Sequence, residues 1–235
     1  MFRFSSWAVG LVAFSMAGGA FAQDPEPMED TEPEAAPAPV ADASAGVSTD
    51  GNGENERKIR LGLRLGYALP MGSAVEGGKM SEEVSGQIPI WLDAGYMVTP
   101  NVLIGLYGQY GFVSLKQSCD GCSAHDIRFG VQGQYHFSPA ESVDPWLGLG
   151  VGYEILGFSQ SAQGQTVDIS FKGFEFLNLQ GGADFKVGNA FSVGPFLSFS
   201  LGQYSKASAN DQSADIDKTA LHQWLTFGAK GTFGL

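Results

Sequence analysis

Apolar and polar residues alternate with a period of two along most of the chain from Lys58 onward. The first segment shows the pattern clearly, because apolar side chains stand at every second position from Ile59 to Leu69. Successive side chains of a β-strand point to opposite faces, so this period predicts strands with one apolar and one polar face. Eight segments carry the pattern: 59–69, 88–96, 102–112, 127–137, 147–155, 177–185, 193–202 and 225–235.

The composition of the two faces distinguishes a membrane barrel from a soluble one. The polar face consists mostly of Gly, Gln, Ser and Asn with a few charges, whereas a soluble barrel presents many Lys and Glu side chains to water. The apolar face is continuous within each segment and carries aromatic residues toward its ends, as a lipid-facing band does. We therefore expect the apolar face to contact lipid and the polar face to line a narrow interior.

Two places break the alternation. Phe174 and Phe176 lie in the opposite phase from the rest of the sixth segment, which predicts a β-bulge or an early strand end there. Pro195 lacks a backbone N–H group and is expected to weaken the hydrogen-bond ladder of the seventh segment.

The connections between the segments alternate in length. Long connections follow the odd-numbered segments, and short ones, such as 99–101 and 188–189, follow the even-numbered segments. Outer-membrane barrels have long extracellular loops and short periplasmic turns. The sequence therefore predicts an all-β fold over 58–235, an eight-stranded antiparallel up-and-down transmembrane β-barrel with both of its ends in the periplasm.

The first 57 residues have a different character. Arg3, the apolar run from Trp7 to Ala17 and the small residues on either side of Phe21 predict a cleaved signal peptide over 1–22. The apolar run is shorter than the ~20 residues that a membrane-spanning helix needs. Residues 23–57 are rich in Pro, Ala, Glu and Asp, without aromatic residues, which predicts a disordered acidic periplasmic tether.

Much of the formal net charge of -12 belongs to this tether, which holds ten carboxylates and a single base. The remainder of the mature chain is only mildly acidic. Nucleic-acid binding requires a basic surface, so we expect no nucleic-acid partner.

The stretch from Lys58 to Leu235 resembles the small outer-membrane barrels of the OmpX, OmpA and OmpW kind. The resemblance rests on the architecture and on short motifs: Gly-Tyr at 66–67, Leu-Gly-Leu-Gly-Val-Gly-Tyr at 147–153 and Gly-Gly-Ala-Asp-Phe at 181–185. It implies residence among outer-membrane lipids and insertion by the barrel assembly machinery, which reads a C-terminal aromatic pattern close to Phe233-Gly234-Leu235. It implies no particular activity, and the acidic tether is not part of it.

Cys119 and Cys122 are the only cysteines and form a C-x-x-C motif. Such a spacing occurs in redox dithiols and in half of a zinc site, but a structural zinc site needs four ligands and there is no second cysteine pair. Asp120 and His125 could complete only a weak site. In an exported loop a small disulfide is the favoured interpretation, so we expect neither a metal nor another cofactor.

Charged residues at inward-facing positions are expected to form a network inside the barrel, because eight strands enclose little more than their own side chains. Within this network, Arg60 or Arg64 should pair with Asp93 on the neighbouring strand. A polar pathway through the lumen is the alternative. The predicted network consists of Arg60, Arg64, Asp93, Arg128, Glu154, Asp184 and Lys230.

Three function classes follow. A structural or surface-interaction protein without catalysis is favoured, although its extracellular partner is not identified by the sequence. A transporter that passes small apolar molecules through the barrel wall, as resemblance to OmpW would allow, should have an apolar pocket lined by Trp91, Tyr107 and Phe196. A lipid-modifying enzyme would need a rim histidine, either His125 with Ser123 or His222 with loop residues; such histidines are more often solvated.

Overall fold

The structure, a computed structural model, describes residues 58–116, 121–162, 165–210 and 212–235. The expected signal peptide and tether, and Cys119 of the expected disulfide, lie outside these residues. The described helical structure includes no segment with the length and hydropathy of a membrane-spanning helix.

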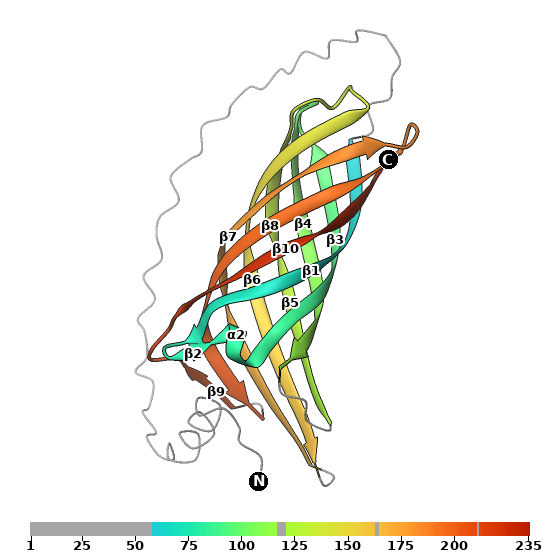
Figure 1. Cartoon of the computed structure of the whole chain (residues 1–235). Coiled ribbons are helices and arrows are strands. Elements are labelled where there is room, and N and C mark those ends of the chain that lie inside the picture. Colours follow the sequence, from blue (N-terminus) through green and yellow to red (C-terminus); the bar gives the residue numbers. More distant parts are fainter. Residues whose placement is uncertain (1–57, 117–120, 163–164, 211) are drawn as a thin grey trace, which may run out of the picture. The chain divides into compact units, whose positions relative to one another are not determined.

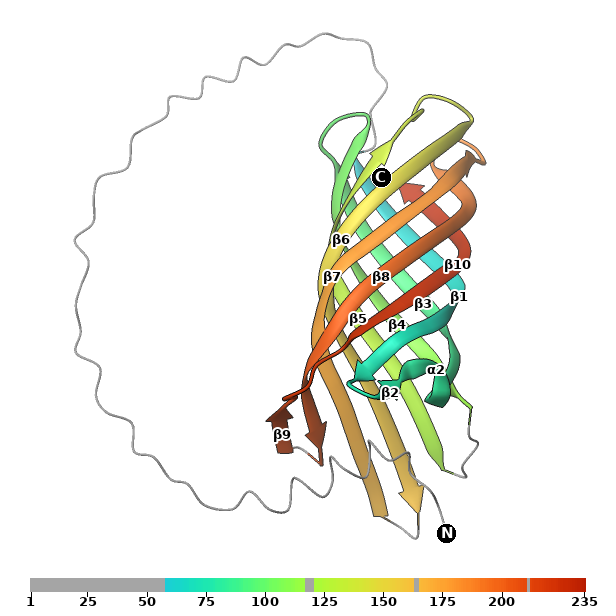
Figure 2. The same ribbon diagram turned by 60° about the vertical axis from the view of Figure 1, so that its left-hand side comes forward.

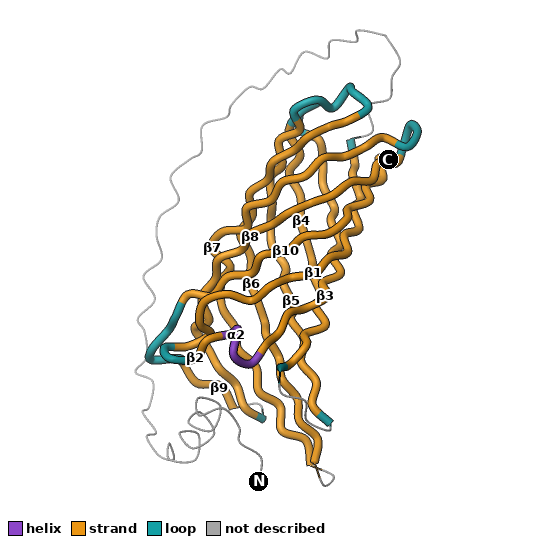
Figure 3. Tube along the Cα trace, in the orientation of Figure 1, coloured by secondary structure: helices purple, strands orange, loops and turns teal. Residues whose placement is uncertain are grey.

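Eight long antiparallel strands form a closed ring (Figures 1 and 3). Closure comes from the last strand, which pairs with both the first strand and the one that precedes it in the ring. The eight-stranded barrel predicted from the alternation is therefore confirmed. In ring order the strands are β1 (Ile59–Val75), β3 (Val84–Met97), β4 (Val102–Leu115), β5 (Cys122–His136), β6 (Val143–Ala162), β7 (Gln165–Lys186), β8 (Phe191–Ala209) and β10 (Leu221–Gly234).

The two ends of the barrel differ, as the connection lengths predict. The connections β3–β4, β5–β6 and β7–β8 are short and lie at the same end as the C-terminus (Figure 2). The opposite end carries the small elements β2 (Gly78–Lys79), α2 (Met80–Glu83) and β9 (Gln212–Asp215). We call this second end the loop end and the first the turn end.

The strands run further toward the loop end than the sequence indicates. The segments expected at 147–155 and 177–185 belong to β6 and β7, whose pairing continues to Ala162 and Gln165. The long connection expected after the fifth segment is therefore mostly paired strand, and that expectation was wrong. A strand needs alternating apolar and polar residues only where one of its faces contacts lipid. The strand extensions beyond the membrane therefore do not show this alternation in the sequence.

The phase change at Phe174 and Phe176 is a bulge within a continuous strand. The pairing of β7 with β8 shifts between Glu175 and Leu177, and its pairing with β6 shifts between Gly150 and Gly152. Phe174 and Phe176 are both exposed on the outer surface. The bulge therefore keeps the aromatic side chains outside while the chain gains one residue.

Large apolar side chains cover the outside of the barrel in a continuous belt. Leu63 is 55% exposed, Leu92 66% and Leu106 61%, and each stands on a different strand. A soluble monomer rarely exposes an apolar patch of such extent, and a belt that encircles the barrel is suited to hydrocarbon. The inward-facing positions carry most of the buried polar residues.

Candidate functional site: the side chains that fill the lumen

Arg64 of β1 occupies the middle of the barrel interior and is fully buried. Its Nε donates to Asp93 Oδ2 at 2.7 Å, and its Nη2 donates to Asp93 Oδ1 at 2.9 Å. Nη1 donates to Gln180 Oε1 at 2.6 Å, and Nη2 lies 3.2 Å from Gln132 Oε1. These partners come from β3, β7 and β5, so a single guanidinium connects opposite sides of the ring.

Aromatic rings close the space around this guanidinium. Its Cζ lies 5.0 Å from the ring centroid of Trp91 and 5.5 Å from those of Trp146 and Phe196. Trp91 also stacks on Tyr107 with centroids 5.6 Å apart. Trp91, Tyr107 and Phe196, the expected lining of a transport pocket, are 0%, 3% and 4% exposed. Trp91 packs against both Tyr107 and Phe196, and Trp91 and Phe196 pack against Arg64, so these side chains fill the middle of the lumen.

A second layer lies toward the turn end. Lys230 of β10 is buried and reaches Asp184 Oδ2 at 3.7 Å and Gln134 Oε1 at 3.2 Å. Its Nζ stands 4.1 Å from the Trp146 ring centroid, and the Trp146 indole N–H donates to Asp184. Lys230 and Asp184 were expected inside the barrel, and the structure brings them together.

A third layer, on the loop side of Arg64, is built around Arg128 of β5. Its Nε lies 2.9 Å from Asp126 Oδ2 and 3.7 Å from Glu154 Oε2, and its Nη1 lies 3.8 Å from Glu175 Oε1. Nη1 also donates to Ser200 Oγ at 3.0 Å. We call this group of three carboxylates around one guanidinium the Arg128 cluster.

Glu154 joins the Arg128 cluster to three aromatic side chains of β8 and β10. It accepts hydrogen bonds from Tyr204 Oη at 2.5 Å and from Trp224 Nε1 at 3.1 Å, and it contacts His222 Nε2 at 2.9 Å. Tyr204 and His222 stack with centroids 4.0 Å apart. Buried charges need partners of this kind to offset their desolvation.

Beyond the Arg128 cluster, toward the loop end, the interior becomes apolar. A core of side chains from α2 and from β1, β3, β6, β7, β8 and β10 surrounds Met80, Leu156 and Phe171, all of which are nearly or completely buried. Gly72 and Gly77 adopt positive φ values where β1 ends and turns toward β2, a conformation that favours glycine. The segment 71–84 thereby folds against the strands instead of forming an open loop.

Several expected site residues lie elsewhere. Arg60 is only partly buried and makes no ion pair with the residues that the structure describes. His222 was expected at the solvated rim, but it is 1% exposed inside the Arg128 cluster, so that expectation was wrong. The reason is that β10 begins at Leu221, which directs the next side chain inward.

His125 is at the loop end but does not form a catalytic pair. It stacks on Tyr110 of β4, with centroids 6.0 Å apart and ring planes 1° apart. Ser123 is two positions away on β5, and within the described ranges no hydrogen bond joins the two side chains. Cys122 begins β5, and because Cys119 is outside the described residues the disulfide stays a prediction.

Sequence reasoning missed several members of the filled lumen. Asp126 precedes the expected fourth strand, and Glu175 lies at the bulge, where the period-two pattern changes phase. His136 of β5 contacts Asp144 at 2.7 Å near the turn end. Among the described residues, no group of three or more His, Cys, Asp or Glu side chains is arranged to hold a metal ion.

No protein-family model and no curated protein matches the chain. Solved structures with a related arrangement include Neisserial surface protein A, with 13% identity over 75% of this chain and 97% of that one and a TM-score of 0.48. Outer membrane protein OprG from Pseudomonas aeruginosa has 17% identity over 77% of this chain and 98% of that one, with a TM-score of 0.47.

The outer membrane protease OmpT from Escherichia coli has 10% identity over 80% of this chain and 100% of that one, with a TM-score of 0.41. Similarity at this level assigns no activity to the chain. The barrel itself rests on the closed ring of strands described above.

Proposed function

We propose that the chain is an outer-membrane β-barrel with a structural or surface-interaction role and a lumen closed by its own side chains. The observation that carries this proposal is the position of Arg64. Its guanidinium has partners on β3, β5 and β7 and aromatic neighbours on β3, β6 and β8. A group in contact with so many strands leaves little room for a continuous aqueous path.

The outer surface supports a location among outer-membrane lipids. The belt of exposed apolar side chains includes aromatic residues near both of its edges, such as Tyr67 and Phe112 toward the loop end and Tyr96 and Phe137 toward the turn end. Aromatic side chains favour the interfaces of a bilayer. In this proposal the turn end faces the periplasm, the loop end faces outward, and the barrel assembly machinery inserts the chain.

Transport through the wall is a weaker alternative. It needs an apolar pocket in the outer half of the lumen, yet that half holds the Arg128 cluster and the apolar core around Met80 and Phe171. Catalysis is weaker still, because His222 is engaged by Glu154 and His125 is stacked on Tyr110. We therefore propose a protein without enzymatic activity.

A liposome-swelling assay tests the closed lumen. The protein, purified from outer membranes and shown to be folded by heat-modifiable electrophoretic migration, is reconstituted with sugars of increasing size outside the liposomes. We expect swelling no faster than in protein-free liposomes. An Arg64→Ala/Trp91→Ala variant, which removes the central side chains, serves as the control and should swell faster. Rapid swelling by the unaltered protein that depends on sugar size would refute the proposal.

Uptake of an apolar fluorescent probe tests the transport alternative in the same liposomes. A closed, non-transporting barrel should take up the probe at the rate of protein-free liposomes. Probe uptake faster than in protein-free liposomes, without permeation by sugars, would show transport of apolar molecules through the barrel wall and would refute the proposal.

A further inference from the structure

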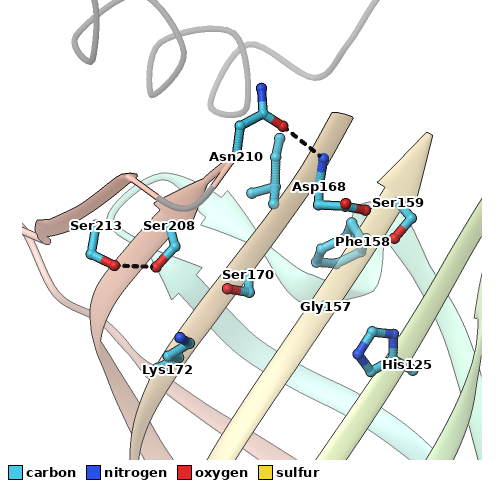
Figure 4. Close-up of a pocket in the computed structure, with 11 residues that line it drawn as sticks. His125, Gly157, Phe158, Ser159, Asp168, Ser170, Lys172, Ser208, Asn210 and Ser213 are labelled. Carbon is cyan, nitrogen blue, oxygen red and sulfur yellow. Dashed lines mark hydrogen bonds between the residues drawn. The ribbon is translucent and has the colours of Figure 1, made fainter. Parts of the chain in front are cut away.

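A polar pocket lies on the barrel wall at the loop end, across β5, β6, β7 and the region of β8 and β9 (Figure 4). Its volume is about 240 Å³. Ligand pockets for drug-sized molecules have volumes of about 300–1,000 Å³, so this one suits a small polar headgroup and not a larger ligand. It is lined by His125, Gly157, Phe158, Ser159, Asp168, Ile169, Ser170, Lys172, Ser208, Asn210 and Ser213.

The chemistry of this lining is that of a site for hydroxyl groups and an anion. Four serines, Asp168 and Asn210 offer hydroxyl, carboxylate and amide groups. Ser208 and Ser213 already share a hydrogen bond at 2.7 Å, and Asn210 Oδ1 accepts from the Asp168 backbone N–H at 3.2 Å. Figure 4 shows the side chains of Lys172 and His125 on the side of the pocket away from Asn210.

Two lysines stand opposite each other beside this pocket, of which Lys172 belongs to the lining, and Asp215 of β9 is the register partner of Lys206 on its other side. Lys172 of β7 and Lys206 of β8 are direct register partners, so their side chains leave the same face of the sheet. Like charges directly opposite each other are unfavourable. Within the described part of the chain neither lysine forms an ion pair. An anion bound between them would relieve the repulsion.

The position of the pocket relative to the apolar belt indicates where that anion comes from. Phe174, 58% exposed, stands two positions after Lys172 on the same face of β7. It forms an outward aromatic row with Tyr153 and Phe129, with centroids 5.3 and 6.0 Å apart. Two residues of strand span about 7 Å, so Lys172 lies just beyond the belt, at the depth of lipid headgroups.

We propose that this pocket binds the phosphorylated sugar headgroup of a glycolipid in the outer leaflet. The ammonium groups of Lys172 and Lys206 pair with the phosphate, while Ser170 and Asp168 accept or donate hydrogen bonds to the sugar hydroxyls. The lipid's acyl chains continue along the belt past Phe174. The assignment rests on the proposed function only in taking the loop end as the outward one.

Lipid binding by the whole protein in neutral detergent micelles tests the site. The probe is lipid A bisphosphate, a phosphorylated disaccharide lipid, and its dephosphorylated form is the comparison ligand. We expect the Lys172→Gln/Lys206→Gln variant to lose affinity for the bisphosphate about 30-fold, because each lysine contributes separately to the attraction. Its affinity for the dephosphorylated lipid should be unchanged.

A matched variant, Lys79→Gln/Lys218→Gln, removes the same charge from the same end of the barrel. Lys218 is exposed and paired with Glu76 at 3.4 Å, away from the pocket lining. Its affinity for the bisphosphate should stay within about twofold of the unaltered protein because screening weakens exposed charges. Equal losses in the two variants, or no loss in either, would overturn the proposal.

Two more outcomes bear on the source of the phosphate. Displacement of lipid A by an equal concentration of inorganic phosphate would assign the pocket to free phosphate and overturn the lipid assignment. If the unaltered protein bound the dephosphorylated lipid as tightly as the bisphosphate, the site would not recognise phosphate, and the proposal would be overturned. Heat-modifiable migration of each variant verifies folding, and swelling of liposomes would refute the closed lumen without changing the binding results.

Discussion

Arg64 on β1 and Asp93 on β3 form a two-point ion pair between neighbouring strands, with N–O distances of 2.7 and 2.9 Å. Both side chains face the interior, where a charge without a partner is costly. The arrangement shows how an apolar barrel exterior coexists with a charged interior, because these two buried charges offset each other across neighbouring strands. The pair therefore holds the ring together at its middle.

Removal of the Asp93 carboxylate should destabilise the barrel strongly. Asp93→Ala leaves the buried Arg64 guanidinium without its anion, and breaking a buried pair in this way costs about 3–5 kcal/mol. Urea-induced unfolding in detergent micelles measures the free energy. Glu76→Ala, which breaks the exposed pair with Lys218, is the control and should cost only about 0–1 kcal/mol. Equal stabilities for Asp93→Ala and the unaltered barrel would exclude a structural role for the pair.

Glu154 offers a second test at the loop side of the lumen. Glu154→Ala removes the acceptor for Tyr204 and Trp224 and the partner of His222, and unsatisfied buried donors should cost at least about 2 kcal/mol in the free energy of unfolding. The emission of Trp224 should also shift as its environment changes. Glu141→Ala, at an exposed turn position, should leave both unchanged. If Glu154→Ala kept the emission spectrum and the stability of the unaltered protein, Glu154 would have no stabilising role in the Arg128 cluster.

The tightness of the packing predicts that one glycine cannot be enlarged. A Cβ atom at Gly130 would stand 2.7 Å from Gly152 Cα and 2.8 Å from the Tyr107 hydroxyl oxygen. Gly130→Ala should therefore cost about 1–3 kcal/mol in the free energy of unfolding, as overpacking does. Gly108 has no atom within 4 Å of such a Cβ, so Gly108→Ala should change stability by no more than about 0.5 kcal/mol. The same loss in both variants would mean that packing at Gly130 is not the cause.

Much of the barrel could be predicted from its lipid-facing side chains. The bilayer requires apolar residues on one face of every strand. This requirement produces the alternation of apolar and polar residues from Ile59 to Leu69 and in the other segments. The same alternation places Arg64 and Asp93 inward on adjacent strands. Their two-point pairing depends on the register of β1 and β3, in which Asp93 lies opposite Gly62 and is therefore the diagonal neighbour of Arg64.

The parts that could not be predicted lie where that requirement ends. Beyond the belt neither face of a strand meets hydrocarbon, so the extensions of β6 to Ala162 and β8 to Ala209 carry no clear signal. Glu175 is hidden by the bulge, which reverses the phase of β7. The outward pairing of Lys172 with Lys206 appears only when the register of these extensions is known.

Single-channel recording in planar lipid bilayers tests the closed lumen most directly. The unaltered protein and the Arg64→Ala/Trp91→Ala variant are each purified from outer membranes and reconstituted in separate bilayers. Currents are recorded at the same protein amount, voltage and salt concentration. We expect a silent baseline from the unaltered protein and discrete steps from the variant. Reproducible conductance steps of uniform size from the unaltered protein would contradict the account, because they require a continuous aqueous path past Arg64.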